Sequence, residues 1–241
     1  MPNMKVLLRA CAVLFICLCC ATPAWAALAV TTTATKDQDA NADPWTFTVD
    51  TVSGDNLLVV QCFTSSDQSG GDPTVTHNGD APTALSKISN ASAVSYAFSA
   101  SWVNPDIGTG LTVSVDWFSS TSSDGGCIAR VFSGASTVTG AQTATSTGDS
   151  FHQITVTCPS GAEILAAFGL QGVTETPTYA SGQSAVFQGN DGGNTYDFSR
   201  KDGGGDGVMS WDWTTNANAT MIGVCVNAAV SRRPIAPIIL Q

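Results

Sequence analysis

The sequence "SGDNLLVV" (residues 53–60) begins with the residues of a tight turn and continues into a short apolar run. Ser, Gly, Asp and Asn favour turns, whereas a short run of Leu and Val between turn signals is typical of a buried β-strand. "SGAEILAA" (160–167) has the same form in the second half of the chain. We interpret this echo as recurring turn chemistry, with an internal duplication as the alternative.

Strands separated by turn residues are predicted along the whole chain. Apolar, Thr-rich runs recur at intervals of roughly ten residues, between clusters of Gly, Asn, Asp and Ser. Gly and β-branched residues form helices poorly, and this spacing favours a sandwich or barrel over βαβ units. The predicted strands are Trp45 to Val49, Leu57 to Phe63, Ser95 to Val103, Leu111 to Phe118, Cys127 to Phe132, Ile154 to Cys158, Ile164 to Leu170 and Met221 to Ala228.

The N-terminus has the features of a cleaved secretory signal. Two basic residues precede an apolar run from Ala10 to Ala21, and Ala24-Trp25-Ala26 supplies the small residues that signal peptidase prefers. We predict a signal helix over residues 1–26, with cleavage after Ala26 or, alternatively, after Ala29. The run is too short to span a bilayer, and no later stretch reaches the apolar length that a membrane helix needs. The expected location is therefore secreted, periplasmic or at the cell surface.

The charge of the mature chain excludes one class of partner. Lys and Arg number 9 in the whole chain, against 19 Asp and Glu. Lys5 and Arg9 leave with the signal, so the net charge falls from -10 to about −12. Because nucleic-acid binding depends on neutralising phosphates with basic side chains, we expect no nucleic-acid partner.

Four cysteines remain after the signal and enter an oxidising compartment, where disulfides form readily. They are Cys62, Cys127, Cys158 and Cys225. Alternation within Cys127 to Phe132 places Arg130 on the face opposite Cys127, and Cys158 shares a face with Ile154 and Val156. Both cysteines are therefore predicted to point into the core. On this basis we favour pairing Cys127 with Cys158 and Cys62 with Cys225, although three pairings can be drawn.

Residues 231–241, "SRRPIAPIILQ", depart from the strand pattern. Two prolines prevent this tail from continuing a central strand. One interpretation is an arm that packs on its own domain or frays. The other is a docking arm that makes a homo-oligomer by placing Ile235, Ile238, Ile239 and Leu240 on a neighbouring subunit.

Five segments together resemble an uncharacterised secreted β-sandwich module, jelly-roll-like, that occurs in bacterial exported proteins and phage virion-associated proteins. The resemblance covers most of the mature chain and implies one antiparallel β-sandwich of jelly-roll type over residues 27–230. It implies no functional residues, because its motifs are strand and turn patterns. The segments are "TVSGDNLLVV" (51–60), "TVTHNGDAPTAL" (74–85), "WVNPDIGTGLTVSV" (102–115), "ARVFSG" (129–134) and "SWDWTTNANATMIGVCVNA" (210–228).

No catalytic signature is found in the sequence. The chain has two histidines and lacks G-x-S-x-G, H-E-x-x-H and phosphate-loop motifs. His77 lies in "THNGD", where Asn78-Gly79 supplies a tight hairpin turn, and we expect a solvated side chain there. The two glutamates, Glu163 and Glu175, are not placed together by any pattern. We therefore expect a non-catalytic protein, and we predict Asp116 to be an outward-facing strand residue or part of a cleft.

"GNDGGNTYDFSRKDGGGDGVMSWDW" (189–213) is the stretch richest in candidate ligand-binding residues. We predict a hairpin around Gly203-Gly204, in which Phe198 faces Met209, Tyr196 faces Trp211, Asp197 faces Ser210 and Thr195 faces Asp212. We expect the aromatic face to be core, with Tyr196, Trp211, Trp213 and Asp116 as the alternative sugar-binding set. Calcium is the one cofactor that the acidic turns make plausible, with Asp191, Asp202 and Asp206 as candidate ligands.

These observations predict an exported structural or adhesive protein of a cell-surface or virion-associated assembly, which contacts polysaccharide. The alternative is a carbohydrate-active enzyme or carbohydrate-binding module, with Asp116, Asp197 and Asp212 in a groove lined by tryptophans. A convergent pair of carboxylates in a concave site would favour the enzyme. A flat apolar patch or an unpaired strand edge would favour the assembly protein.

Overall fold

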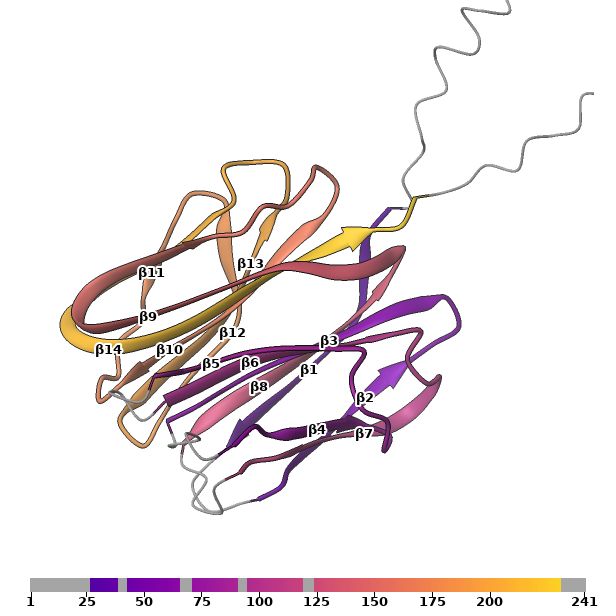
Figure 1. Ribbon diagram of the computed structural model, residues 1–241, viewed down its shortest axis with the longest axis horizontal. Helices are drawn as coiled ribbons and strands as arrows, with labels where there is room; N and C mark the ends of the chain where they lie inside the picture. The colour runs from indigo at the N-terminus through magenta and orange to yellow at the C-terminus, as the bar shows by residue number, and fades with distance from the viewer. Residues whose placement is uncertain (1–26, 39–42, 66–70, 91–94, 119–123, 231–241) are drawn as a thin grey trace, which may run out of the picture.

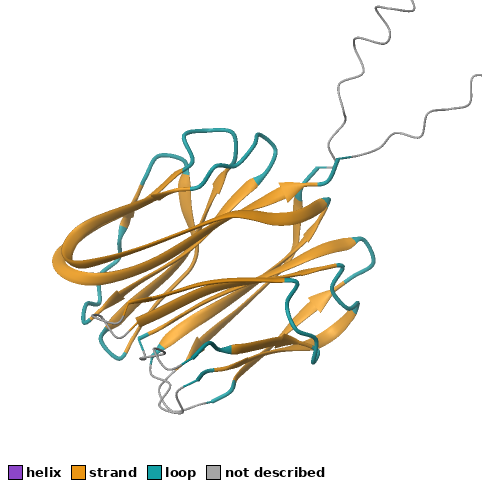
Figure 2. Cartoon of the chain, viewed as in Figure 1, coloured by secondary structure: helices purple, strands orange, loops and turns teal. Residues whose placement is uncertain are grey.

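The computed structural model describes residues 27–38, 43–65, 71–90, 95–118 and 124–230. These residues form β-strands and turns without a helix (Figure 2), which confirms the all-β prediction. The predicted signal, residues 1–26, and the predicted tail, residues 231–241, lie outside the described residues.

The strands of the first half are β1 (Ala29–Gln38), β2 (Trp45–Thr51), β3 (Asp55–Thr64), β4 (Thr74–His77), β5 (Ala84–Asn90), β6 (Ser95–Val103), β7 (Gly108–Asp116) and β8 (Gly125–Ser133). Those of the second half are β9 (Ala135–Thr155), β10 (Glu163–Gln171), β11 (Thr178–Tyr179), β12 (Gln183–Asp191), β13 (Asn194–Asp202) and β14 (Val208–Ala228).

The first half forms an antiparallel sandwich, which we call the first sandwich. One sheet has the strand order β1-β8-β3-β6-β5, and the other has the order β2-β7-β4. The chain therefore crosses repeatedly from one sheet to the other, as in a jelly roll. This confirms a β-sandwich, but the strands of the one sandwich predicted over residues 27–230 divide into two, of which this is the first.

The second half repeats the strand order of the first sandwich. It does so with fewer strands, since β9 and β14 are long and each contributes one segment to each of two sheets. β14 pairs with β10 over residues 218–226, but with β11 and the end of β9 over residues 208–212. The register shifts between Asp212 and Ala217, where the strand bends. Figure 1 shows β9 and β14 turning back together at the left of the view. One layer then has the order β9-β14-β10-β13-β12, and the other is made of the end of β9, the start of β14, and β11. We call this the second sandwich.

The two sequences quoted at the outset begin the central strands of the two sandwiches. The Asp55 amide donates to the Val52 carbonyl at 3.0 Å, and the Ala162 amide donates to the Pro159 carbonyl at 3.2 Å. Each turn needs a glycine, because its third residue has φ of 101° at Gly54 and 82° at Gly161. The recurring turn is therefore real, and the strand order around it recurs as well.

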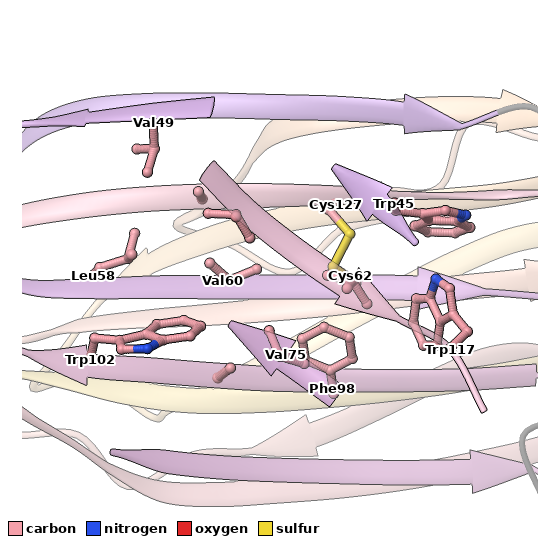
Figure 3. Packing of buried hydrophobic residues seen from close by; sticks show 14 of the residues in the cluster. Trp45, Val49, Leu58, Val60, Cys62, Val75, Phe98, Trp102, Trp117 and Cys127 are labelled. Carbon is pink, nitrogen blue, oxygen red and sulfur yellow. A yellow bond between two sulfur atoms is a disulfide. The ribbon is translucent and has the colours of Figure 1, made fainter. Parts of the chain in front are cut away.

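Three apolar layers hold the molecule together. One lies between the sheets of the first sandwich and includes Trp45, Phe98, Trp102 and Trp117 (Figure 3). Another fills the second sandwich around Phe168 and the two tryptophans of β14. The third lies where the five-stranded sheet of the first sandwich packs on β10, β13 and β14 of the second, and includes Leu57, Phe63, Leu165, Tyr196 and Ile222.

Arg130 lies in this last layer and not on the surface. Its position opposite Cys127, Ala129 and Val131 is as predicted, since those three residues belong to the core of the first sandwich. However, both faces of β8 are covered, and Arg130 forms an ion pair with Glu163 of β10 while only 5% exposed. A charged residue within a strand therefore lies at the interface between the sandwiches and not in solvent. Its burial is possible because Glu163 supplies the opposite charge.

The predicted disulfide pairing is wrong. Cys62 bonds to Cys127 on the neighbouring strand, and Cys158 bonds to Cys225. Cys127 and Cys158 do both point into a core, as predicted, but into different ones. Because two sheets lie between these cores, a bond from Cys127 to Cys158 is excluded by geometry. Two disulfides are what an oxidising compartment permits.

The predicted hairpin around Gly203-Gly204 is also wrong. β13 and β14 do not pair with each other, because β10 lies between them and pairs with both. The two-residue turn is Gly192-Gly193 instead, with φ of 54° and 88°, and it joins β12 to β13. Tyr196 consequently faces the layer between the sandwiches, whereas Trp211 faces the core of the second sandwich.

Candidate functional site

A polar cleft opens at one corner of the first sandwich, where the turn after β4 meets the loop between β6 and β7. The turn is built as predicted: Asn78 and Gly79 both have positive φ, at 52° and 92°. The His77 and Asp80 backbones exchange hydrogen bonds of 2.9 Å in each direction. This tight turn holds His77 and Asp80 side by side at the mouth of the sandwich.

His77 forms the inner wall of the cleft. Its side chain is 1% exposed, and its ring lies 6.0 Å from that of Trp102, edge to face. The Trp102 Nε1 donates to the Asp80 carbonyl at 3.0 Å, which ties this wall to the turn. Burial lowers the pKa of His77, although the charges of Asp106 and Asp80 act in the opposite direction. The imidazole is therefore neutral at neutral pH.

The opposite wall comes from the loop between β6 and β7. The Asn104 amide donates to the Asn56 carbonyl at 2.8 Å, and Asn104 has φ of 52°. The Asn78 Nδ2 donates to Asp106 Oδ2 at 2.7 Å, which joins the two walls. The resulting hollow, which we call the His77 cleft, has a volume of about 280 Å³. It is lined by His77, Asp80, Ala81, Thr83, Trp102, Val103, Asn104, Pro105 and Asp106.

The chemistry of the His77 cleft is that of a binding site for hydrogen-bond donors. Asp80 and Asp106 bring two carboxylates to its exposed rim. The Nε2 of His77 is buried and has no hydrogen-bond partner, which is uncommon for a buried polar atom. A hydroxyl- or amine-bearing ligand would donate hydrogen bonds to the two exposed carboxylates.

Sequence reasoning missed this site because it placed His77 in solvent. The turn prediction was right, but the side chain is buried. The signal was present in "TVTH" (74–77), where Val75 faces the core and strand alternation puts His77 on the same face. Trp102 lies near the end of β6 and Asp106 in the loop that follows, both distant from His77 along the chain, and nothing local in the sequence joins them to it.

The predicted aromatic set is placed in the protein interior, as expected. Tyr196 and Trp211 are 0% exposed, and Trp213 is 7% exposed. The Tyr196 hydroxyl donates to Asp37 of β1, and the Trp211 ring stacks on Phe168 at 4.9 Å and 8°. These rings offer no open face to a sugar, so the structure does not bring them together as a groove.

The predicted acidic residues also lie apart. Asp116 is exposed at the end of β7, and Asp212 is exposed on β14 at the outer face of the second sandwich. Asp197 is fully buried, where it accepts hydrogen bonds from Tyr179 Oη at 2.7 Å and Trp211 Nε1 at 3.0 Å. Burial raises the pKa of Asp197 against these hydrogen bonds. This carboxylate is enclosed by its partners and does not open to a cleft.

The candidate calcium ligands have other partners. Asp202 lies 3.3 Å from Arg200, and Asp206 accepts from Lys201 Nζ at 2.7 Å. Asp191 ends β12 beside the Gly192-Gly193 turn, at the opposite end of the β12–β13 pair from Asp202. Over the residues that the structure describes, no group of three or more His, Cys, Asp or Glu side chains is arranged to hold a metal ion.

A second hollow, of about 410 Å³, lies between β1 and β2. It is lined by Thr35, Lys36, Thr46, Phe47, Thr48 and Thr112. Its threonines lie at outward-facing strand positions. None of the residues that line this hollow has a buried polar atom without a hydrogen-bond partner. The His77 cleft is therefore the better candidate site.

Comparison with protein-family models, with curated proteins and with solved structures found no match to this chain. The resemblance to an exported or virion-associated module accordingly stays an expectation. Within the described ranges, no helix has the length and apolar character to cross a membrane.

Proposed function

We propose that this protein is an exported, non-catalytic adhesive or structural component of a cell-surface or virion-associated assembly, and that it contacts polysaccharide through the His77 cleft. The observation that carries the proposal is the cleft itself, whose lining is mostly polar and includes the exposed side chains of Asp80, Asn104 and Asp106 beside Trp102. Sugars supply several hydroxyl donors on one small ring, which suits a compact cleft rich in acceptors.

The surrounding architecture supports a structural role. The two sandwiches pack through an apolar layer that also holds the Arg130–Glu163 ion pair. Each sandwich has its own disulfide, Cys62–Cys127 in the first and Cys158–Cys225 in the second. Covalent and buried cross-links of this kind favour a rigid body that survives outside the cell.

The hydrogen bonding in the cleft supports binding without nucleophilic catalysis. A nucleophilic hydroxyl would be hydrogen-bonded to the imidazole that activates it. The hydroxyl that lines the cleft belongs to Thr83, and its Oγ1 accepts instead from the Val103 amide at 3.2 Å. Among the described residues, no hydroxyl is therefore hydrogen-bonded to His77 Nε2 as a nucleophile would be.

A glycan array tests the proposed function. The purified protein is applied with calcium and again with chelator, and binding to a set of glycans is expected in both conditions. Asp106→Asn should weaken that binding, whereas Asp212→Asn, which removes the same charge from the second sandwich, should not. Absence of binding in both conditions would contradict the polysaccharide contact.

A carbohydrate-active enzyme is the second candidate, because Asp80 and Asp106 line one cleft beside His77 and a glycosidase needs two carboxylates. Incubation with each glycan that binds, followed by assay of new reducing ends, separates the two. We expect none to be released. Release that Asp80→Asn or Asp106→Asn abolishes would establish the enzyme and overturn the non-catalytic proposal.

A further inference from the structure

Exposed apolar side chains gather at the end of the molecule where the chain leaves β14. We call this group the apolar patch, and it consists of Val30, Val52, Val103, Ile107 and Val230. Ile107 is 62% exposed and Val230 is 56% exposed, so these side chains are not part of any core. Because apolar groups gathered on the surface of an exported protein mark a place of contact, the patch calls for a partner.

Hydrogen bonds hold the first part of the patch together. Asp55 accepts from the Thr31 hydroxyl at 2.8 Å and from the Val52 amide at 2.7 Å, which places the start of β1 beside the turn after β2. The Thr51 hydroxyl bonds on both sides of Ile107, to the carbonyl of the residue before it and to the amide of the residue after it. The start of β1 and the loop before β7 therefore flank Val52.

The end of β14 belongs to the same group. The Ala229 amide donates to the Gly134 carbonyl at 2.7 Å, and the Gly134 amide donates to Asn56 Oδ1 at 2.9 Å. The Asn56 carbonyl in turn accepts from the amide of the residue after Val103, at 2.8 Å. Figure 1 shows the yellow end of β14 beside the indigo start of β1. Val230 comes next in the chain, so the tail, residues 231–241, begins within the apolar patch.

The tail matches the chemistry of the place where it begins. It has two adjacent arginines and no acidic residue, and its large apolar side chains are Ile235, Ile238, Ile239 and Leu240. Beside the patch, Asp50 and Asp106 are exposed, and neither takes part in the ion pairs that the described residues form. The apolar and the basic groups of the tail therefore both have a complement there.

We infer that residues 231–241 dock on the apolar patch of their own chain. The two arginines lie against Asp50 and Asp106, and the apolar side chains that follow cover the patch. Eleven residues reach about 36 Å when extended, which spans several neighbouring strands. Attachment at Val230 gives the tail an effective concentration on the order of millimolar at this surface, which favours its own chain over a second copy. This contact is independent of the polysaccharide contact proposed above.

Trypsin tests the docking in the full-length folded protein. It cleaves after Arg, so it can cut between Arg232 and Arg233, and mass spectrometry follows the loss of the tail. When docking and release are fast, the rate of cleavage measures the fraction of molecules in which the tail is released. A synthetic peptide of residues 227–241 gives the rate for an undocked tail. The folded protein should be cleaved more slowly than the peptide by about tenfold or more, the scale of burying one or two apolar side chains.

Substitutions on either side of the contact locate it. Ile107→Ser in the patch and Ile239→Ser in the tail should each raise the rate of cleavage by about fivefold, because each removes one apolar partner. Phe151→Ser is the matched control, since Phe151 is 44% exposed but lies beside Asp212 on β9, away from the patch. It should leave the rate unchanged. Melting curves verify that the Ile107 variant is folded, and the Ile239 variant leaves the described structure intact.

Three results would overturn the inference. Cleavage of the folded protein as fast as the peptide would show that the tail does not dock. Protection that neither Ile107→Ser nor Ile239→Ser reduces would place the tail on another surface. Protection that grows with protein concentration, together with a dimer mass by light scattering, would show that the patch holds the tail of a second copy. Protection that is independent of concentration and is lost in both variants supports docking within one chain.

Discussion

The two sandwiches share one strand order, yet their interiors differ. The core of the first is apolar and aromatic, with Trp45 and Trp117 in edge-to-face contact at 5.0 Å. The core of the second encloses the carboxylate of Asp197 between Tyr179 and Trp211. The same arrangement of strands thus tolerates an apolar core and one that contains a carboxylate, because Asp197 is hydrogen-bonded to Tyr179 and Trp211.

The corners of the sandwiches differ in a way that bears on function. Leu58 and Ile164 are the first inward-facing residues of the central strands, and they pair with Trp102 and Lys201 respectively. Lys201 reaches the following loop, where its Nζ donates to Asp206 Oδ1 at 2.7 Å and the Val208 carbonyl at 2.9 Å. Trp102 instead lines the open His77 cleft. Both sandwiches have this corner at the start of the central strand. Whether it is open or closed depends on the residue paired there, which is Trp102 in the first sandwich and Lys201 in the second.

Removal of a disulfide should have the largest effect, and a similar one in either sandwich. Cys62–Cys127 and Cys158–Cys225 have sequence separations of 65 and 67, so they restrict the unfolded chain almost equally. Each loss should lower the free energy of unfolding by about 4 kcal/mol. Denaturant titration of the two double Cys→Ala variants measures this. A large difference between them would show that local packing outweighs chain entropy and that the sandwiches are not equivalent.

The next largest effect should come from the ion pair that joins the sandwiches. Arg130→Met or Glu163→Gln leaves a buried group without its partner and should cost about 3 kcal/mol. The double variant Arg130→Met/Glu163→Leu should recover most of that loss, since it removes both charges. Arg200→Met is the control, because Arg200 lies 3.8 Å from the same carboxylate but is 40% exposed. An equal loss in this control would contradict the importance of burial.

A smaller effect of opposite sign is expected in the polar core of the second sandwich. Asp197→Asn keeps an oxygen that accepts from Trp211 Nε1, and its new amide nitrogen can donate to the Tyr179 hydroxyl. Because it also removes a buried charge, the variant should stabilise the protein by about 1 kcal/mol at neutral pH. The folded-state pKa of Asp197 is raised, so the wild type loses stability as pH rises above the ordinary Asp range. Melting curves across acidic and neutral pH should show the advantage of the variant growing with pH. A constant difference would contradict the raised pKa.

The smallest effect is expected at the closed corner. Lys201 and hydrogen bonding lower the pKa of Asp206, so this group stabilises the fold above its unfolded-state pKa and the contribution is lost as pH falls through the folded-state pKa. Asp206→Asn should therefore lower the melting temperature slightly at neutral pH and not at strongly acidic pH. Asp116→Asn, on an exposed strand end, serves as the control. If the two variants behave alike, the ion pair does not hold the corner shut.

Much of the fold followed from local patterns, and the errors share one cause. The strands around Leu57 to Phe63 and Ile164 to Leu170 are predictable, because a short apolar run between turn residues is visible within the segment itself. The pairing of β13 with β14 was mispredicted because a third strand, β10, lies between them. The candidate site was missed for the same reason, since His77 and Asp106 meet only in the folded chain.

Sequence alone determined the all-β class, the turns at Gly54, Gly79 and Gly161, and the inward direction of Cys127 and Cys158. These properties depend on backbone conformation and strand alternation, which neighbouring residues encode. Tertiary structure alone decided which cysteines bond, that Arg130 is buried against Glu163, and that one corner is open where Lys201 closes the other. Those outcomes depend on contacts between residues distant in the sequence, which no local pattern specifies.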